Sequence, residues 1–193
     1  ASIEKLGRRA VVACCDVSEP AQIRELFRRL DTEFGRIDFL GNVAGDGVLG
    51  TPEDISLEEV ERCWRNLVLG RFCMCQEAGR RMLAAGRGQV INTASFAGLA
   101  GAPSIMSYGV SKAAVVALSE QLRAETHGTG VTVSVLCPAF FRTNLLESWQ
   151  GNARMKGFAD KMMASSPDTL ESVSDAVFAA VERGQFLVIP TVK

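Results

Sequence analysis

The sequence predicts an α/β protein built on a doubly wound parallel sheet, with helices on both faces and hence three layers, α/β/α. Short apolar runs at residues 10–15, 37–43, 90–93, 131–136 and 186–189 have the length and composition of strands buried on both faces. Helical stretches with one apolar face separate these runs, which is the alternation typical of parallel sheets. With 193 residues, the chain is long enough for one such domain, which we expect to cover residues 1–193.

The composition excludes several classes of function. The formal net charge is −1, so the chain has no basic surface for nucleic acid or acidic lipid. No apolar run reaches the roughly 18 residues of a membrane span, and no signal peptide opens the sequence. The six cysteines lie inside apolar patterns without zinc-ligand spacing, so we expect reduced thiols in a cytoplasmic protein, and no metal site.

The chain opens with the end of a helix, for which Gly7 suits the C-terminal cap. Residues 10–15 follow as the first strand. Ser18 is predicted to cap the next helix, with Pro20 in its first turn and Gly35 after its last. The apolar stripe of this helix consists of Ile23, Leu26, Phe27, Leu30 and Phe34.

The next strand, residues 37–43, leads into a tight turn at Ala44 and Gly45. Small residues in this turn let the backbone approach a ligand closely, although a plain tight turn explains the same residues equally well. A long helical segment at 57–85 follows, and residues 169–182 form the last predicted helix.

The chemistry is predicted on the helix that opens around Tyr108 and Lys112. These residues lie four positions apart, so they share one face of the helix with adjacent side chains. An ammonium beside a phenol stabilises the phenolate, and lowering the pKa of a tyrosine by about three units takes about 4 kcal/mol. One unit charge at about 4 Å supplies roughly that much. Tyr108 is therefore the candidate general acid and base, and Lys112 the group that lowers its pKa.

Ser95 follows the strand at 90–93 and is expected on a loop at its carboxyl end, where ligand sites of open α/β sheets gather. Its hydroxyl can donate to a carbonyl oxygen while Tyr108 donates a second hydrogen bond and then its proton. This arrangement suits a ketone or secondary alcohol that exchanges a hydride with a cofactor. Ser95, Tyr108 and Lys112 are the predicted catalytic residues.

Together with other short motifs, these residues resemble the short-chain dehydrogenase/reductase family. The shared pieces follow the family's order: Asp16 with Val17, the turn from Asn42 to Gly45, Ser95, Tyr108 with Lys112, and the segment from Pro138 to Thr143. The resemblance covers nearly the whole chain from about Ala10. It implies a Rossmann-like fold that binds NAD or NADP.

The resemblance also implies which residues hold the cofactor. Asp16 would bind the adenine amine, although by itself Asp16 also suits a turn residue at the end of a strand. The other implied cofactor residues are Val17 near the adenine ring, Asn42, Ala44 and Gly45 under the adenosine ribose, Tyr108 and Lys112 at the nicotinamide end, and Pro138, Phe141 and Thr143 around the carboxamide.

The chain departs from the family pattern at two places. The family's relay asparagine stands three residues before the glycine found here as Gly70, but that position holds Leu67, and Asn66 is one residue earlier. Because one residue on a helix is about 100° of rotation, either a local bulge brings Asn66 into position, or Asn66 is polar surface and the relay group is missing. The family's glycine-rich pyrophosphate turn is not found in residues 1–193. We therefore expect further chain before Ala1, which would also hold the residue that selects NAD or NADP.

Two functions fit these residues. The first is an NAD(P)-dependent oxidoreductase that interconverts a secondary alcohol and a ketone. The alternative is a dinucleotide-binding sensor or scaffold of the same fold, which the displaced Asn66 and the absent glycine turn favour. The complete set of Ser95, Tyr108 and Lys112 favours the enzyme, because a sensor has no need of all three.

Two further features concern partners. Methionines and a phenylalanine at helical spacing in residues 155–163 predict a lid over an apolar small-molecule carbonyl or alcohol substrate, with plain core packing as the alternative. The Tyr108 helix is apolar around much of its circumference and rich in small residues, which predicts close packing against a second copy of the chain. We expect a homodimer or homotetramer through this helix and the segment 57–85.

Overall fold

The main sheet has four parallel strands. The computed structural model describes residues 2–45, 47–143, 150–151 and 153–190. Along the sheet the strands follow in chain order: β1 (Phe39–Asn42), β3 (Gly88–Thr93), β4 (Val131–Leu136) and β6 (Leu187–Val188). Each step to the next parallel strand crosses through a helical segment, so all four carboxyl ends lie at one edge. The predicted α/β fold with a parallel sheet is confirmed.

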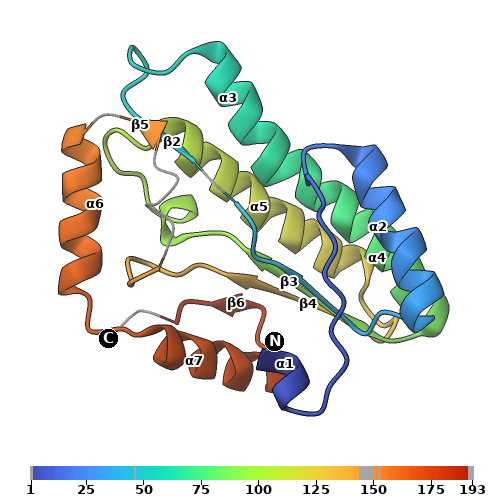
Figure 1. The fold of residues 1–193 in the computed structure, drawn as a ribbon. Helices are drawn as coiled ribbons and strands as arrows, with labels where there is room; N and C mark the ends of the chain where they lie inside the picture. Colours follow the sequence, from blue (N-terminus) through green and yellow to red (C-terminus); the bar gives the residue numbers. More distant parts are fainter. Residues whose placement is uncertain (1, 46, 144–149, 152, 191–193) are drawn as a thin grey trace.

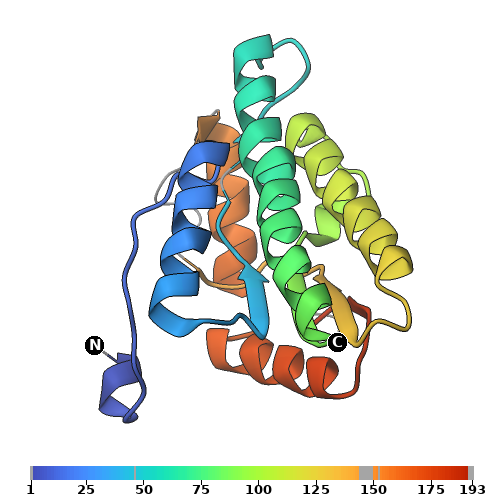
Figure 2. The same cartoon turned by 90° about the vertical axis from the view of Figure 1, so that its right-hand side faces the viewer.

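Helices cover the sheet on both faces, which gives the predicted three layers. The first face carries α2 (Pro20–Phe34), α4 (Gly70–Ala85) and α5 (Met106–Glu125), and α7 (Leu170–Glu182) lies on the other face (Figures 1 and 2). The remaining elements are α1 (Ser2–Lys5), α3 (Leu57–Trp64), α6 (Ala153–Ser165) and a small parallel sheet of β2 (Val48–Leu49) and β5 (Gln150–Gly151).

The core between the first helical layer and the sheet follows the predicted periodicities. In α2, Ile23 and Phe27 are fully buried, whereas Phe34 at the end of the stripe is 46% exposed. Ile23 and Phe27 pack against apolar residues of β1, β3, β4 and α4, namely Leu40, Cys75, Ala78, Met82, Val90, Val131 and Val133. Burial of such apolar side chains is the main force that holds helices on a sheet.

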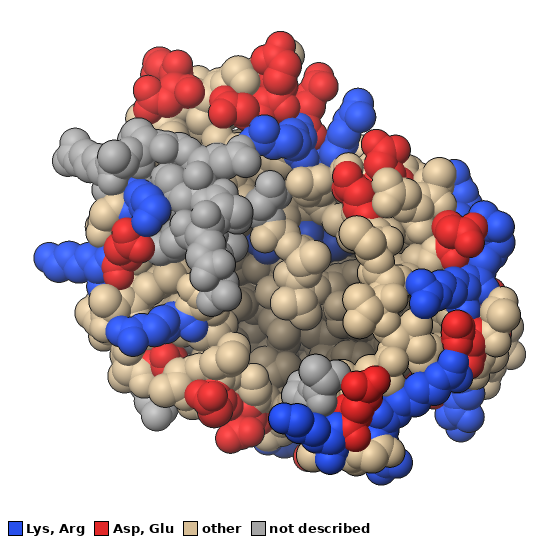
Figure 3. All heavy atoms as spheres, viewed as in Figure 1, with Lys and Arg blue, Asp and Glu red and all other residues tan. Residues whose placement is uncertain are grey.

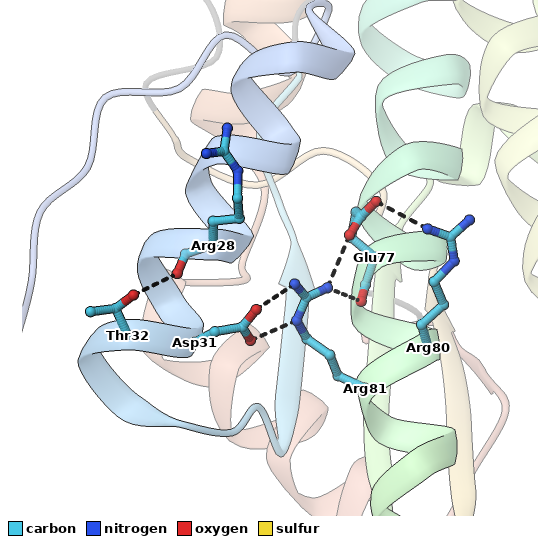
Figure 4. Close-up of polar contacts among 6 residues, drawn as sticks. All are labelled: Arg28, Asp31, Thr32, Glu77, Arg80 and Arg81. Carbon is cyan, nitrogen blue, oxygen red and sulfur yellow. Dashed lines mark hydrogen bonds and ion pairs between the residues drawn. The ribbon is translucent and has the colours of Figure 1, made fainter.

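Helices α2 and α4 are also joined by ionic contacts (Figure 4). The guanidinium of Arg81 donates from Nε and Nη2 to the two carboxylate oxygens of Asp31, at 2.7 and 2.6 Å. Its Nη1 donates to Glu77 Oε2 at 2.9 Å, and the guanidinium carbon lies 5.0 Å from the centre of the Phe27 ring. We call Asp31, Glu77 and Arg81 the brace.

The strand predicted at residues 10–15 is wrong. The segment runs without strand pairing, and Val12 is 90% exposed. A buried strand needs a hydrogen-bonded neighbour on each side, and none of the strands in the described ranges lies beside this segment. Instead, Arg9 before it binds Glu33 of α2.

The predicted cap of α2 is also wrong. The N-cap residue is Glu19, without a side-chain cap bond, and Pro20 opens the helix as expected. The Ser18 hydroxyl and backbone N–H both donate to Asp16 Oδ1, at 2.8 and 2.9 Å. Ser18 therefore forms a local turn with Asp16 and does not cap the helix. The predicted end of α2 at Gly35 is confirmed, in the left-handed conformation that favours glycine.

Two further observations bear on the expected setting of the protein. Within the part of the chain that the structure describes, no helix has the length and apolarity needed to cross a membrane. All six cysteines have free thiols.

Candidate active site

Tyr108 and Lys112 lie together on the first turns of α5, as their spacing predicts. The Lys112 ammonium nitrogen is 5.4 Å from the centre of the Tyr108 ring. Only 5% of Lys112 is exposed, and its Nζ donates to the backbone oxygen of Thr93, the last residue of β3, at 3.0 Å. The amine is therefore held at the carboxyl edge of the sheet and does not extend into solvent.

Ser95 joins this pair from the loop after β3. It is the N-cap of a short 3₁₀ helix, Phe96–Gly98, and its Oγ accepts a hydrogen bond from the backbone N–H of Ala97 at 3.2 Å. Its side chain also hydrogen-bonds the phenol of Tyr108. The N–H of Phe96 donates to the oxygen of Pro138 at 2.9 Å, which ties the Ser95 loop to the segment after β4. The three predicted catalytic residues thus meet at one edge of the sheet.

A glycine outside the predicted motifs makes room for the Tyr108 ring. A Cβ atom built on Gly47 would lie 2.4 Å from Tyr108 Cδ2, well inside van der Waals contact. One residue further on, the carbonyl of Val48 in β2 accepts a 2.8 Å hydrogen bond from Ser107 Oγ at the start of α5. Sequence reasoning missed Gly47, because it lies far along the chain from Tyr108 and belongs to no motif.

The helical segment predicted at 57–85 contains a bulge at the position that the sequence left open. Residues Arg65–Leu69 form a π-helical turn between α3 and α4. Such turns insert one residue into a helix and shift the phase of what precedes them. Leu67 is fully buried in the protein, whereas Asn66 is half-buried and lines a pocket with Asn42 and Arg71. The structure therefore contains the local bulge that one of the two alternatives requires, and Asn66 lines this pocket; its role as the relay group stays a prediction.

Arg71, one turn after the bulge, is a site residue that the sequence did not reveal. It is 3% exposed, and its guanidinium donates to three backbone oxygens: Leu67 at 2.7 Å, Ala44 at 2.8 Å and Thr93 at 3.4 Å. The sequence did show a charged residue among apolar neighbours on a buried helix. Such a side chain usually extends to solvent, so this pattern alone does not indicate a site residue.

The ionisation of the pair differs from the expectation that Lys112 lowers the pKa of Tyr108. Burial raises the pKa of Tyr108 above its ordinary value, while the hydrogen bond with Ser95 and the positive charge of Arg71 act in the opposite direction. Burial, followed by repulsion from Arg71, lowers the pKa of Lys112 to about 7. Arg71 is therefore a positive charge that acts on the Tyr108 phenol.

Three residues predicted on the adenosine side of a cofactor meet in one pocket, although they come from two separate segments. Val17, Asn42 and Ala44 line it together with Asn66 and Arg71, and its other lining residues are Gly41, Val43, Gly70 and Met74. The face of the molecule drawn in Figure 3 has a central hollow. Its walls consist mostly of uncharged residues, and atoms of basic side chains are visible inside it.

Three of the predicted cofactor residues have protein partners of their own. Asp16 is exposed, and its hydrogen bonds to Ser18 lower the pKa of its carboxyl, which is the turn role that its position also allowed. The Asn42 amide donates to Asn92 Oδ1 at 2.9 Å inside the sheet. Gly45 leaves space for protein side chains, since a Cβ there would lie 2.8 Å from Leu67 Cδ2 and 3.2 Å from an Arg71 nitrogen.

The segment after β4 stands at the same edge of the sheet. Pro138, Phe141 and Thr143 are half-buried, and Pro138 is tied to the Ser95 loop by its hydrogen bond with Phe96. The neighbouring Phe140 meets Phe158 of α6 edge to face, with ring centres 6.2 Å apart. A role of Pro138, Phe141 and Thr143 in cofactor binding stays a prediction.

The fold and the site define a Rossmann-like α/β protein with a serine, a tyrosine and a lysine at the carboxyl edge of a parallel sheet. The family model for short chain dehydrogenases matches residues 1–154. The chain is 38% identical over 138 residues to the D-threitol dehydrogenase of Mycolicibacterium smegmatis, which covers 71% of this chain. It belongs to the short-chain dehydrogenase family, and the predicted resemblance is confirmed.

Two further comparisons agree. The meso-2,3-butanediol dehydrogenase of Serratia marcescens is 28% identical over 185 residues, covering 93% of this chain and 71% of that protein. A short-chain dehydrogenase/reductase from Burkholderia phymatum, solved in complex with NAD, superposes with a TM-score of 0.91 at 26% identity, covering 98% of this chain and 73% of that one. This chain spans about half the length of the D-threitol dehydrogenase, 53%.

Proposed function

We propose that this chain forms the catalytic part of an NAD(P)-dependent oxidoreductase that interconverts a secondary alcohol and a ketone. The observation that carries the proposal is the meeting of Ser95, Tyr108 and Lys112 at the carboxyl edge of the sheet, with the amine 5.4 Å from the phenol ring centre. A sensor or scaffold has no use for an acid, a cation and an orienting hydroxyl gathered at one edge of the sheet.

The residues present suit a bound dinucleotide. Two buried polar atoms beside the site, Arg71 Nε and Thr93 Oγ1, have no hydrogen-bond partner among the residues that the structure describes, and a ligand in the adjacent pocket could satisfy such atoms. Val17, Asn42 and Ala44 would hold the adenosine part, and Pro138, Phe141 and Thr143 the nicotinamide part. The cofactor would supply the hydride acceptor or donor. NAD, as bound by the Burkholderia phymatum protein, and NADP are both candidates.

The chain's own residues would handle the substrate oxygen and its proton. The Ser95 hydroxyl orients the oxygen, and Tyr108 donates the proton to it in reduction or removes it in oxidation. Lys112 would hold the ribose of the cofactor, and with a pKa of about 7 its amine takes up and releases a proton near neutral pH. Asn66, brought round by the π-helical turn, would connect this pair to solvent.

We propose a small-molecule alcohol or carbonyl substrate with an apolar part. Phe140 and Phe158 support the apolar part, since they are in edge-to-face contact yet 39% and 51% exposed. On α6, Met163 is buried, which supports core packing, whereas Met162 is 37% exposed and so remains a candidate for the lid. The names of the threitol and butanediol dehydrogenases point instead to small molecules with several hydroxyl groups, so a substrate panel should contain both apolar alcohols and such polyols.

The test replaces Tyr108 by Phe in the full-length protein. We expect turnover of an accepted alcohol to fall about a thousandfold, because the proton donor is removed while ring and cofactor contacts stay. Dinucleotide binding, followed by quenching of protein fluorescence, should remain within a few fold of the parent. Turnover equal to that of the parent would reject Tyr108 as the acid, and a protein that binds dinucleotide without oxidising it for any carbonyl would favour the sensor.

Two expectations about the setting remain proposals. A homodimer or homotetramer through α4 and α5 is supported by exposed apolar side chains on these helices, namely Phe72, Leu83, Met106 and Val110. A cytoplasmic location is supported by the six free thiols.

A further inference from the structure

Arg71 is a buried arginine with unusual surroundings. It is 3% exposed, and neither it nor Lys112 forms an ion pair with a carboxylate among the described residues. Its hydrogen bonds go to the backbone oxygens of Leu67, Ala44 and Thr93, and its Nε has no partner in the described part of the chain. Burying a charge without a counter-charge costs free energy. Buried arginines without a carboxylate partner are therefore uncommon unless they serve a function.

The position of the guanidinium relates it directly to the catalytic pair. Arg71 Nη2 and Lys112 Nζ donate to the same acceptor, the oxygen of Thr93, at 3.4 and 3.0 Å. Two cations around one carbonyl oxygen repel each other at short range and in a poorly solvated place. The other titratable groups that act on either cation are neutral in their usual state: Tyr108 from α5, Cys63 from α3, Cys75 from α4 and Cys137 after β4.

We propose that Arg71 is a positioning residue of the active site: its permanent charge, fixed to the turn after β1 and the end of β3, sets the protonation of Tyr108 and Lys112. A guanidinium stays charged at every pH at which the protein is folded, whereas a buried lysine readily loses its proton. Arg71 therefore supplies the constant positive potential at the phenol, and Lys112 is free to take up and release a proton.

The ionisation of the pair supports this division of roles. The charge of Arg71 lowers the pKa of Tyr108 against the effect of burial, and it lowers the pKa of Lys112 in addition to the effect of burial. The inference rests on the proposed function for the catalytic importance of Tyr108. The effect of Arg71 on the phenol itself can be measured without substrate or cofactor.

Tyr108 is the single tyrosine of these 193 residues, so its phenolate can be followed by ultraviolet difference absorbance. The full-length protein is titrated with and without Tyr108→Phe, and subtraction leaves the signal of Tyr108 alone. Arg71→Gln removes the charge but keeps hydrogen-bond donors, and Arg71→Lys keeps a charge. We expect Arg71→Gln to move the midpoint up by about one pH unit and Arg71→Lys to move it much less.

Lys112 could take over the charge when Arg71 is neutral, so the comparison is repeated with Lys112→Met in both proteins. There the shift caused by Arg71→Gln should be at least as large. Equal midpoints for arginine and glutamine in both backgrounds, with folding verified by circular dichroism, would overturn the proposal, as would equal shifts by Arg71→Gln and Arg71→Lys. A failure of the proposed function would show elsewhere, as full turnover by Tyr108→Phe.

Discussion

The two ends of helix α4 use arginine in opposite ways. Near its start, Arg71 is 3% exposed, bonds only backbone oxygens and stands beside Lys112. Near its other end, Arg81 forms the brace with Asp31 and Glu77. Burial lowers the pKa of Arg71, whereas the bonds to Asp31 raise the pKa of Arg81. The folded state therefore opposes the charge of Arg71 and favours the charge of Arg81.

The difference separates residues that stabilise the fold from residues that serve the site. A cation whose pKa rises on folding contributes stability, and a cation whose pKa falls on folding reduces it. Arg71 and Lys112 belong to the second kind, and they lie beside the proposed general acid. Active sites commonly keep such unfavourable groups because their chemistry needs them. Substitutions at the site end should therefore change turnover, and substitutions in the brace should change stability.

The largest effect in this comparison is expected at Gly47. In Gly47→Ala, the added methyl would overlap the Tyr108 ring at 2.4 Å, so the ring must move. A displacement of the acid by about 1 Å costs about a hundredfold in turnover, and we expect a loss of that size. The matched control is Gly101→Ala, where no atom lies within 4 Å of the new Cβ. Equal turnover of the two variants in steady-state assays would show that Gly47 does not position Tyr108.

A smaller effect is expected at Lys112, where a substitution should raise the stability of the protein. Its pKa falls from 10.5 to about 7 on folding, so the folded state binds its proton less well than the unfolded state. That penalty is full below about pH 7 and disappears as the pH rises toward 10.5. Lys112→Met removes the group, and urea unfolding at pH 6 should show a gain of at least about 1 kcal/mol.

The control for Lys112→Met is the pH dependence itself. The stability gain should shrink steadily between pH 7 and pH 10, because the parent's penalty for burying Lys112 becomes smaller as this amine is more easily deprotonated. A stability difference that stays constant across this range would mean that packing, and not ionisation, causes the gain. Turnover should fall in the same variant, since the proposed function assigns Lys112 to the site.

The smallest effect is expected in the brace. Arg81 is 24% exposed and bonds Asp31 through two nitrogens, so Arg81→Met should lower the free energy of unfolding by about 1 kcal/mol. Arg80→Met is the control, because Arg80 is 65% exposed and meets Glu77 only at 3.5 Å. Thermal melts measure both variants. Turnover per folded molecule should be unchanged in each, and a loss of turnover in Arg81→Met would break the separation between brace and site.

The sequence alone predicted the parts that depend on short spacing along the chain. Tyr108 and Lys112 share a face because helical geometry places residues four apart together. Five apolar runs predicted strands, and four of these strands are present. Because Ser95 follows one of them, the sequence also predicted that Ser95 lies at the edge of the sheet. The family motifs could be recognised for the same reason, since each is a local signature with a fixed place relative to a strand or helix.

Tertiary structure decided the rest, because it depends on contacts between residues far apart in the sequence. Residues 10–15 have the composition of a strand but lack a strand beside them, and pairing requires one. The π-helical turn gives Asn66 its direction, and the packing of Gly47 against Tyr108 follows from a loop and a helix that meet only in the fold. Arg71 acquires its influence in the same way, since burial and a shared backbone oxygen bring its charge to Lys112.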